Sequence, residues 1–386
     1  MRRAALSAGR DKMTATTAAT SLSVALVAPY DLSVAGGVNN QIRAQASALR
    51  GLGHDVRVFG PASGALADGE LALGRTINVT LGGTESGLGV DPRACGAVRR
   101  MLRESFDVVH VHEPFTPLVP WLVVLGARAP IVGTFHVHRE NGHRLYAATS
   151  WALRPLARRL RARIAVSEAA RRTVEPHFPG RYDIVPNGID VRRFQIARPR
   201  PAIMPADRQW VLYVGRLEPR KGVDVLIYAM NRVQKRAPEA SLLIVGDGSE
   251  RQRLEGLARA TGIAATFAGS VPDEDMIACL QASDIVCSPA IGGESFGIVL
   301  LEAMAAGKPI VASRIAGYAE LVGDAGCARL VPPGEDGALA TELLALITNE
   351  ALRRQLGACG AEDVRQYDWE TIARRLVNIY RRVLAK

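Results

Sequence analysis

The chain has 386 residues, 48 % hydrophobic and 22 % charged, with five cysteines and no C-x-x-C pair. This length suits two domains with real cores, while the composition excludes a disordered chain and a membrane-spanning helix. The scattered cysteines argue against a disulfide framework or a structural zinc site. The net charge of +10 is uneven, because residues 1–200 carry 27 Lys and Arg against 15 Asp and Glu. A basic half favours nucleic acid, an anionic membrane or an anionic substrate as partner, or it is an arginine-rich solvated surface.

Strand and helix patterns alternate through the first half of the chain. Residues 1–20 lack the apolar stretch of a secretory signal and are expected to form a flexible tail. A helical pattern over 38–49 lies between short apolar runs of the buried-strand type. These runs fall at residues 23–28, 55–59, 107–111, 131–135, 162–166 and 183–185. The alternation predicts one Rossmann-like domain over residues 21–200.

A proline-rich linker at Arg198–Asp207 precedes a second alternating region. Strands are expected at 210–214, 241–245, 265–268, 284–288, 309–312 and 329–331, and helices at 223–236, 251–260, 273–281 and 296–306. We predict an α/β chain of two doubly wound parallel-sheet domains, 21–200 and 201–368, facing a central cleft. We expect the last helix, 369–386, to pack back on the first domain. Ligands bind such sheets at the carboxyl ends of the strands.

Two strand-to-helix loops are suited to an anionic ligand. Gly36 and Gly37 follow the first strand and let a backbone approach a ligand at a helix N-terminus, although such a pair is often only a tight turn. Arg216, Arg220 and Lys221 follow the first strand of the second domain. Cations clustered there suit a diphosphate, and the alternative is a solvated turn.

The segment GGESFGIVLLEAMAAG at 292–307 contains two glutamates eight residues apart. Glu294 precedes a predicted helix and Glu302 lies about two turns inside it, so both carboxylates point to nearly the same side. Such carboxylates can hold sugar and ribose hydroxyls, and the N–H groups of Ser295, Phe296 and Gly297 can hold a phosphate. The residues next to Glu302 in the sequence are apolar, which argues against a helix face fully exposed to solvent at this position.

Together these motifs resemble glycosyltransferase family 4, whose members are retaining enzymes of the GT-B fold. The matching stretches are PY…GGV, GHDVRVFGPAS, HVHEP, TFH, IAVSEAARR, PNGIDVRRF, VGRLEPRKG and the E-x7-E segment. The resemblance runs from about residue 22 to the C-terminus. It is closest to the bacterial phosphatidylinositol mannosyltransferases, which use GDP-mannose.

The resemblance assigns roles to individual residues. It implies that Arg216 and Lys221 stabilise the departing diphosphate, that Glu294 binds the transferred sugar, and that His136 lies near the reacting carbon. Around the donor it also implies Gly36, Gly37, Arg220, Asp273, Ser295, Phe296, Gly297 and Glu302. On the acceptor side it implies Tyr30, Asn39, Phe115, Val137 and Asn141. The family works without a metal, so we expect no cofactor and no metal, only a nucleotide-sugar donor.

A basic amphipathic helix at 92–103 is expected to contact an anionic membrane surface. Its cationic side spans an arc of about 120° and holds Arg93, Arg99, Arg100 and Arg103. The alternative is an ordinary sheet-covering helix with a solvated face, and a second basic run lies at 154–163. Together with the resemblance, this pattern implies a cytoplasmic protein, peripheral on the membrane, acting on a lipid-linked or glycolipid acceptor.

Three other readings remain open from the residues. The acceptor-side positions that are polar in the phosphatidylinositol enzymes hold Ser33, Phe115, Val137 and Asn141 here, so the acceptor stays undecided. A relative that uses a UDP-sugar and a soluble or polysaccharide acceptor is the nearest rival. A metal site formed by His110, His112, His136 and His138, in place of structural roles for these histidines, is a further alternative. A nucleic-acid-binding protein is disfavoured because aromatics are only 5 % and no nucleic-acid motif is present.

Overall fold

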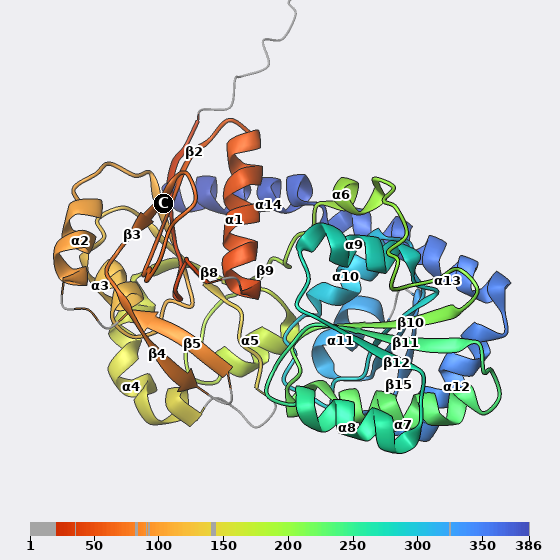
Figure 1. Ribbon diagram of the computed structural model, residues 1–386. Coiled ribbons are helices and arrows are strands. Elements are labelled where there is room, and N and C mark those ends of the chain that lie inside the picture. Colours follow the sequence, from red (N-terminus) through yellow and green to blue (C-terminus); the bar gives the residue numbers. More distant parts are fainter. Residues whose placement is uncertain are drawn as a thin grey trace, which may run out of the picture.

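The computed structural model describes residues 21–34, 36–81, 84–89, 91, 93–139, 144–323 and 326–385. The expected tail at 1–20 and the candidate acceptor residue Asn141 lie outside these residues. Two parallel sheets stand side by side, each covered by helices (Figure 1). The expectation of two doubly wound α/β domains is therefore confirmed.

The first sheet has the order β3-β2-β1-β6-β7-β8-β9, with every pairing parallel. Its strands are β1 (Ser23–Val27), β2 (Asp55–Gly60), β3 (Glu70–Ala72), β6 (Val108–His112), β7 (Ile131–Phe135), β8 (Leu160–Ala165) and β9 (Asp183–Ile184). The helices of this region are α1 (Gly37–Gly51), α2 (Ala94–Met101), α3 (Val119–Gly126), α4 (Arg144–Arg159), α5 (Glu168–Val174) and α6 (Val191–Gln195). Burial on both faces explains why these strands read as short apolar runs rather than as alternating patterns.

The second sheet has the order β12-β11-β10-β13-β14-β15. Its strands are β10 (Gln209–Val214), β11 (Ala240–Val245), β12 (Ala265–Gly269), β13 (Ile285–Ser288), β14 (Ile310–Ser313) and β15 (Ala328–Val331). The helices are η1 (Pro219–Lys221), α7 (Val223–Gln234), α8 (Arg251–Thr261), α9 (Asp273–Ala282), α10 (Ile298–Ala305), α11 (Ala316–Val322), α12 (Asp336–Ile347), α13 (Glu350–Asp363) and η2 (Val364–Tyr367). The strand order reverses beside β10, which is where such sheets bind ligands.

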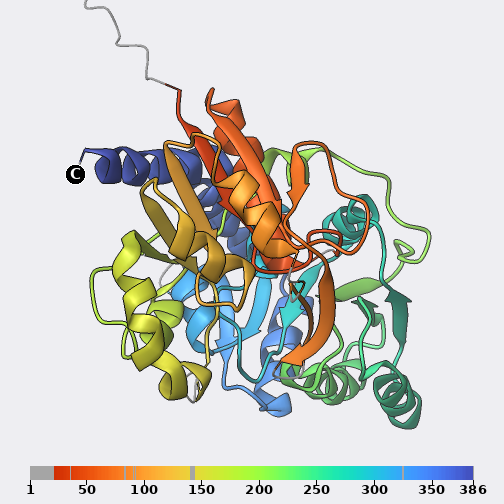
Figure 2. The same cartoon turned by 90° about the vertical axis from the view of Figure 1, so that its left-hand side faces the viewer.

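The last helix, α14 (Trp369–Leu384), leaves the second domain and lies beside α1 on the first (Figures 1 and 2). Its buried side chains, among them Ile372, Leu376 and Tyr380, share one apolar core with strands β1 and β2. Where the chain crosses between the domains, the Ile189 N–H donates to the Tyr367 carbonyl, and the Trp369 N–H donates to the Ile189 carbonyl, at 2.9 and 3.1 Å. The two crossing segments are therefore bound to each other.

Three short strands were not among the expected elements. β3 adds an edge to the first sheet, and β4 (Thr76–Leu81) pairs antiparallel with β5 (Thr84–Gly89) in a separate ribbon. The β4 sequence TINVTL does alternate polar and apolar residues, which is a strand signal. β5 contains two glycines, which weaken the same signal. Among the described residues, no helix combines the length and apolarity needed to cross a bilayer.

Candidate functional site

A cleft of about 790 Å³ lies between the two domains. The first domain contributes α1 and the segment 187–194, and the second contributes the loops after β10 and β13. Nearly all of the residues expected around the donor line it, namely Gly37, Arg216, Arg220, Lys221, Asp273, Glu294, Ser295, Phe296, Gly297 and Glu302. The fold therefore brings together residues that lie up to 265 positions apart in the sequence (37 to 302). Gly36 is exposed just before α1 and is not among the lining residues.

The three cations after β10 are held by two carboxylates. Lys221 Nζ lies 2.8 Å from Glu294 Oε1, and Arg220 pairs with the same oxygen. Glu218 bonds both arginines, at 2.9 Å to Arg216 and 2.9 Å to Arg220. The loop keeps an excess of positive charge at the cleft, which is the arrangement that stabilises a developing anion.

Local backbone geometry fixes this cation loop. Gly222 ends η1 with φ of +64°, and a Cβ there would come within 2.3 Å of the Pro289 carbonyl oxygen. Any other residue would strain the backbone and displace the loop after β13. Burial raises the pKa of Glu294, but Lys221 and Arg220 outweigh it and hold that pKa below its usual value. Glu294 is therefore ionised and already oriented.

Helix α10 begins at Ile298, two residues later than expected, because Gly297 has φ of +97° and forms its N-cap. A Cβ on Gly297 would lie 2.8 Å from the Tyr318 ring. Glu302, inside this helix, lines the same cleft as Glu294. Burial, with a contribution from the charge of Asp273, raises the pKa of Glu302 to about 7. The two carboxylates thus differ in charge state near neutral pH.

Sequence reasoning missed several lining residues. Arg193, on α6, reaches across the cleft to Glu274 at 2.9 Å and to Asp273 at 3.4 Å. Ser288 and Tyr318 also line the cleft and lie in hydrogen-bond contact at 2.8 Å. The motif PNGIDVRRF lies between a strand and a helix, where such sheets bind ligands, so its position could have marked Arg193 as a site residue. Tyr318 carried no such signal, because only the packing of α11 brings it to the cleft.

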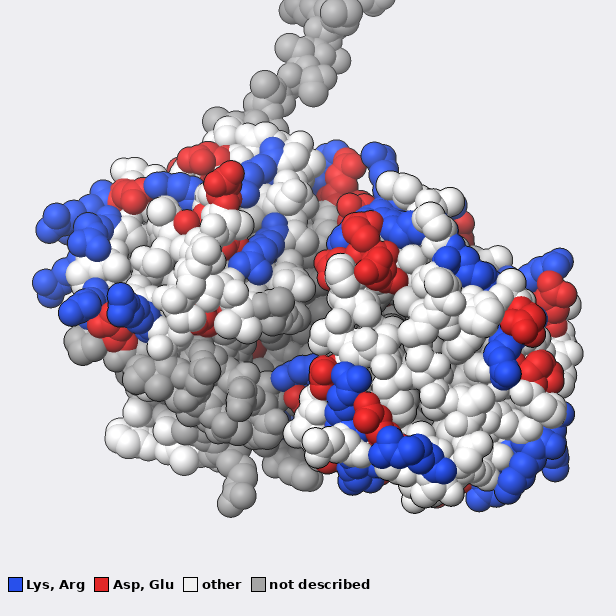
Figure 3. Space-filling view, in the orientation of Figure 1, with Lys and Arg blue, Asp and Glu red and all other residues white. Residues whose placement is uncertain are grey.

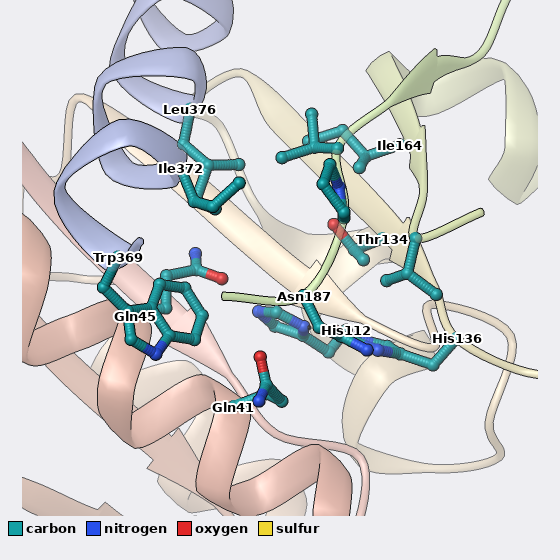
Figure 4. A pocket seen from close by; sticks show the side chains of 13 residues that line it. Gln41, Gln45, His112, Thr134, His136, Ile164, Asn187, Trp369, Ile372 and Leu376 are labelled. Carbon is teal, nitrogen blue, oxygen red and sulfur yellow. Dashed lines mark hydrogen bonds between the residues drawn. The ribbon is translucent and has the colours of Figure 1, made fainter. Parts of the chain in front are cut away.

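His136 lies in a small cavity next to the cleft, and the two share Gln41, Asn187 and Trp369 as lining residues. Figure 4 shows His112, at the end of β6, and His136, directly after the neighbouring β7, pointing toward each other, with Trp369 opposite them. The distance from His112 Nδ1 to His136 Nε2 is 2.8 Å. Burial lowers the pKa of His136 to about 4, so its imidazole is neutral at pH 7.

A buried glutamate holds the loop that carries His136. Glu113 is 2 % exposed and has φ of +44°, and its carboxylate accepts from the N–H groups of His136 and Val137 at 2.5 and 2.9 Å. Burial raises the pKa of Glu113 to about 7, and the two backbone bonds oppose that rise. The HVHEP motif marked this position, but its role as a loop anchor appears only in the fold.

The other histidines of the proposed metal cluster have separate partners. His110 lies 2.6 Å from the Thr134 hydroxyl and 2.7 Å from that of Tyr380, so it joins α14 to the first sheet. His138 Nδ1 lies 3.0 Å from the Ala169 carbonyl. These contacts place His110 and His138 in structural roles.

The acceptor-side candidates do not form one surface. Phe115 is 2 % exposed and packs on Phe178 with ring centroids 4.3 Å apart, so it is a core residue and does not face the cleft. The Asn39 amide is buried and donates to the carbonyl oxygens of Asp31 and Val34, which holds the loop before α1. Tyr30 and Val137 are half-buried and lie around Glu113.

The domains also touch on one side of the cleft. The Ser167 hydroxyl, at the N-cap of α5, donates to the carbonyl of Ser295, in the loop after β13, at 2.6 Å. The carboxylate of Glu320, on α11, accepts from the N–H groups of Glu168 and Ala169 at 2.6 and 3.1 Å. A carboxylate at a helix N-terminus is stabilised by the free N–H groups there. Residues of the second domain therefore cap a helix of the first.

Comparisons with known proteins agree with this geometry. Residues 35–193 match the family described as Glycosyltransferase Family 4, and residues 198–363 match Glycosyl transferases group 1. A phosphatidyl-myo-inositol mannosyltransferase of Mycobacterium leprae is 38 % identical over 366 residues, which cover 94 % of this chain and 97 % of that one. The chain belongs to glycosyltransferase family 4. The predictions of the family and of a sugar-transferring enzyme are thus confirmed.

Further similarities support the subgroup and the fold of this glycosyltransferase. The protein of the same name from Mycolicibacterium smegmatis is 34 % identical over 366 residues and covers 94 % of both chains. A glycosyltransferase structure from Rickettsia africae superposes with a TM-score of 0.76 at 18 % identity, covering 95 % of this chain and 99 % of that one. A sucrose-phosphate synthase from Thermosynechococcus elongatus has the same TM-score at 23 % identity, covering 94 % and 99 %. At such identities the structures show the fold alone.

Proposed function

We propose that this glycosyltransferase moves mannose from GDP-mannose to a lipid acceptor at an anionic membrane surface. The transfer retains the anomeric configuration and needs no metal ion. The observation that carries the proposal is the nearly full-length similarity to enzymes named phosphatidyl-myo-inositol mannosyltransferase, at 34–38 % identity. The cleft supports it with a cation cluster and two half-buried carboxylates among its lining residues.

The cations act on the leaving group. As the bond between the sugar and the diphosphate breaks, negative charge grows on the departing nucleoside diphosphate. Lys221 and Arg216 stand at the carboxyl end of β10 with their charges prearranged, so they stabilise that charge without reorganising. This is the contribution that a divalent metal makes in other transferases. We therefore propose that turnover survives excess chelator.

The carboxylates act on hydroxyl groups. Glu294, ionised and fixed by two cations, accepts from hydroxyls of the transferred sugar. Glu302, further along α10, accepts from the ribose. His136 is neutral and offers a polar imidazole beside the reacting carbon, since a buried imidazolium there would oppose a cationic sugar centre.

A basic surface on the first domain supports the choice of a lipid acceptor. Helices α2, α3 and α4 lie on the face turned to the viewer in Figure 2 and contact one another in that order. Lys and Arg gather over α2 at the left edge of Figure 3. The Trp151 side chain on α4 is 76 % exposed and Leu125 on α3 is 56 % exposed, which suits insertion at the headgroup level. We propose peripheral binding of this face to the cytoplasmic side of the membrane.

The decisive experiment has two arms. Calorimetric titration with GDP, UDP and ADP identifies the nucleobase of the preferred donor. We expect GDP to bind at least about tenfold more tightly than UDP or ADP, which is about 1.4 kcal/mol. Transfer is then measured with GDP-mannose and vesicles containing phosphatidylinositol, and NMR of the product gives the anomeric configuration. Tighter UDP binding with transfer to a soluble glycan contradicts the proposal. An inverted product contradicts the retaining mechanism.

A further inference from the structure

A cluster of two thiols and one carboxylate lies in the second domain, away from the residues that line the cleft. One ligand atom each of Cys327, Cys359 and Asp363 lies within 4.8 Å of the others. Cys327 is fully buried directly before β15, while Cys359 and Asp363 are half-buried on α13. The cluster thus joins a strand of the sheet to a helix that is more than thirty residues further along the chain.

The arrangement fits a thiophilic divalent cation. Residues four apart on a helix share one face, which is how a helix presents two ligands to one metal. In a tetrahedral zinc site, bond lengths of about 2.3 Å to sulfur and 2.1 Å to oxygen place the ligand atoms about 3.6–3.8 Å apart. The ligand atoms here lie within 4.8 Å of one another, so a bound ion would draw them closer by up to about 1 Å. Cys359 and Asp363 are only half-buried, so a water would be the fourth ligand.

The charges around the cluster point the same way. Glu362, the neighbour of Asp363, pairs with Arg365, whereas no described Lys, Arg or His forms an ion pair with Asp363 itself. Two thiolates and a carboxylate at this spacing would bring three negative charges together, and a divalent cation bound between them would balance most of that charge.

We propose that Cys327, Cys359 and Asp363 bind a divalent cation of the zinc class. A disulfide between the cysteines would use only two of the three groups, whereas a cation uses the carboxylate as well. The cation would have a structural role, because none of the three residues lines the cleft.

The cluster lies next to residues that pack against Phe296, which lines the cleft. Val364 follows Asp363 and shares an apolar core with Cys327 and Phe296. Three residues later, the Tyr367 ring meets the Phe296 ring edge-on, with centroids 6.0 Å apart. A metal that joins β15 to the end of α13 would therefore stabilise the packing of Val364 and Tyr367 around Phe296, in the loop after β13.

The test uses the full chain, reduced and stripped with chelator, and titrates it with cobalt(II) and then zinc. One cobalt per chain is expected, with the near-ultraviolet absorption of cobalt–thiolate bonds, displaced by one equivalent of zinc. Cys359→Ser removes a ligand, so it should weaken cobalt binding by more than the about 10- to 100-fold typical of losing a ligand's hydrogen-bond partner, and it should reduce this absorption. Asp363→Asn should keep the absorption but weaken binding by at least about tenfold.

Matched controls separate the site from chance binding. Cys95→Ser changes an exposed cysteine, and Glu362→Gln changes the exposed carboxylate beside Asp363; both should bind cobalt like the parent. Tryptophan fluorescence checks that each variant is folded. The proposal fails if no thiolate absorption develops, or if Asp363→Asn binds cobalt as tightly as the parent. It also fails if the chain, purified without oxygen, already contains a Cys327–Cys359 disulfide.

Discussion

The two domains share one strand topology but place their cations differently. In the first domain Arg99 and Arg100 on α2, with Arg93 and Arg103 just beyond its two ends, are exposed, and no described carboxylate forms an ion pair with any of these side chains. In the second, Arg216, Arg220 and Lys221 stand at a strand end and are bound to Glu218 and Glu294. Unpaired cations on an outer helix suit a diffuse anionic surface, whereas cations fixed by carboxylates suit one defined anion. The difference in placement tells more about function than the net charge.

The largest expected effect tests the outer cations. Changing Arg93, Arg99, Arg100 and Arg103 together to Ser should weaken binding to anionic vesicles by about two to three decades, since each cation contributes about 1 kcal/mol and salt screens part of the sum. Vesicle sedimentation measures this, and binding of GDP should be unchanged.

The matched control removes four exposed arginines from the second domain, by changing Arg236, Arg259, Arg314 and Arg354 to Ser. The change in net charge is identical. If both quadruple variants lose the same affinity, the net charge and not the α2 face accounts for binding.

The next effect tests the fixed cations. Lys221→Ala or Arg216→Ala should lower turnover by on the order of 10²-fold or more, with a smaller effect on GDP affinity, because the leaving-group charge is greatest in the transition state. Steady-state kinetics and calorimetry separate the two. Lys235→Ala, an exposed lysine after α7, is the control. Turnover close to that of the parent would place the diphosphate elsewhere.

A third prediction concerns the contact between the domains. Glu320→Gln removes the charge that caps α5, and hydrogen bonds to charged groups are worth about 1.5–3 kcal/mol. We expect turnover to fall about tenfold and small-angle scattering to show a larger radius of gyration. Glu350→Gln, which changes a surface ion pair, is the control. An unchanged radius together with normal turnover would mean that the cap does not hold the domains together.

The smallest expected effect is a pH dependence. The pKa of Glu302 is raised to about 7, so its carboxylate takes up a proton as the pH falls from 8 to 6. The ionised form is the hydroxyl acceptor, and GDP affinity should therefore fall about five- to tenfold over this range. In Glu302→Gln the affinity should be lower at pH 8 and nearly independent of pH. A slope that persists in this variant would assign the titration to another group, such as Glu113.

Local motifs predicted most of the residues that line the second domain's side of the cleft, because strand-to-helix loops at one sheet edge converge. The family resemblance failed for Phe115, since this side chain turns into an aromatic core that only packing reveals. It also missed Glu320 and Tyr318, which reach their partners through the docking of α11.

By itself, the sequence determined the two parallel sheets, the family and the cation and carboxylate loops, because each depends on short-range periodicity or on one contiguous motif. The tertiary structure alone decided which side chains meet across long separations. Cys327 and Cys359 show this best, since their spacing argued against a metal site, and the packing of α13 against α10 and α12 accompanies their approach in the fold. Contacts between distant segments depend on how whole elements pack, and no local pattern encodes that packing.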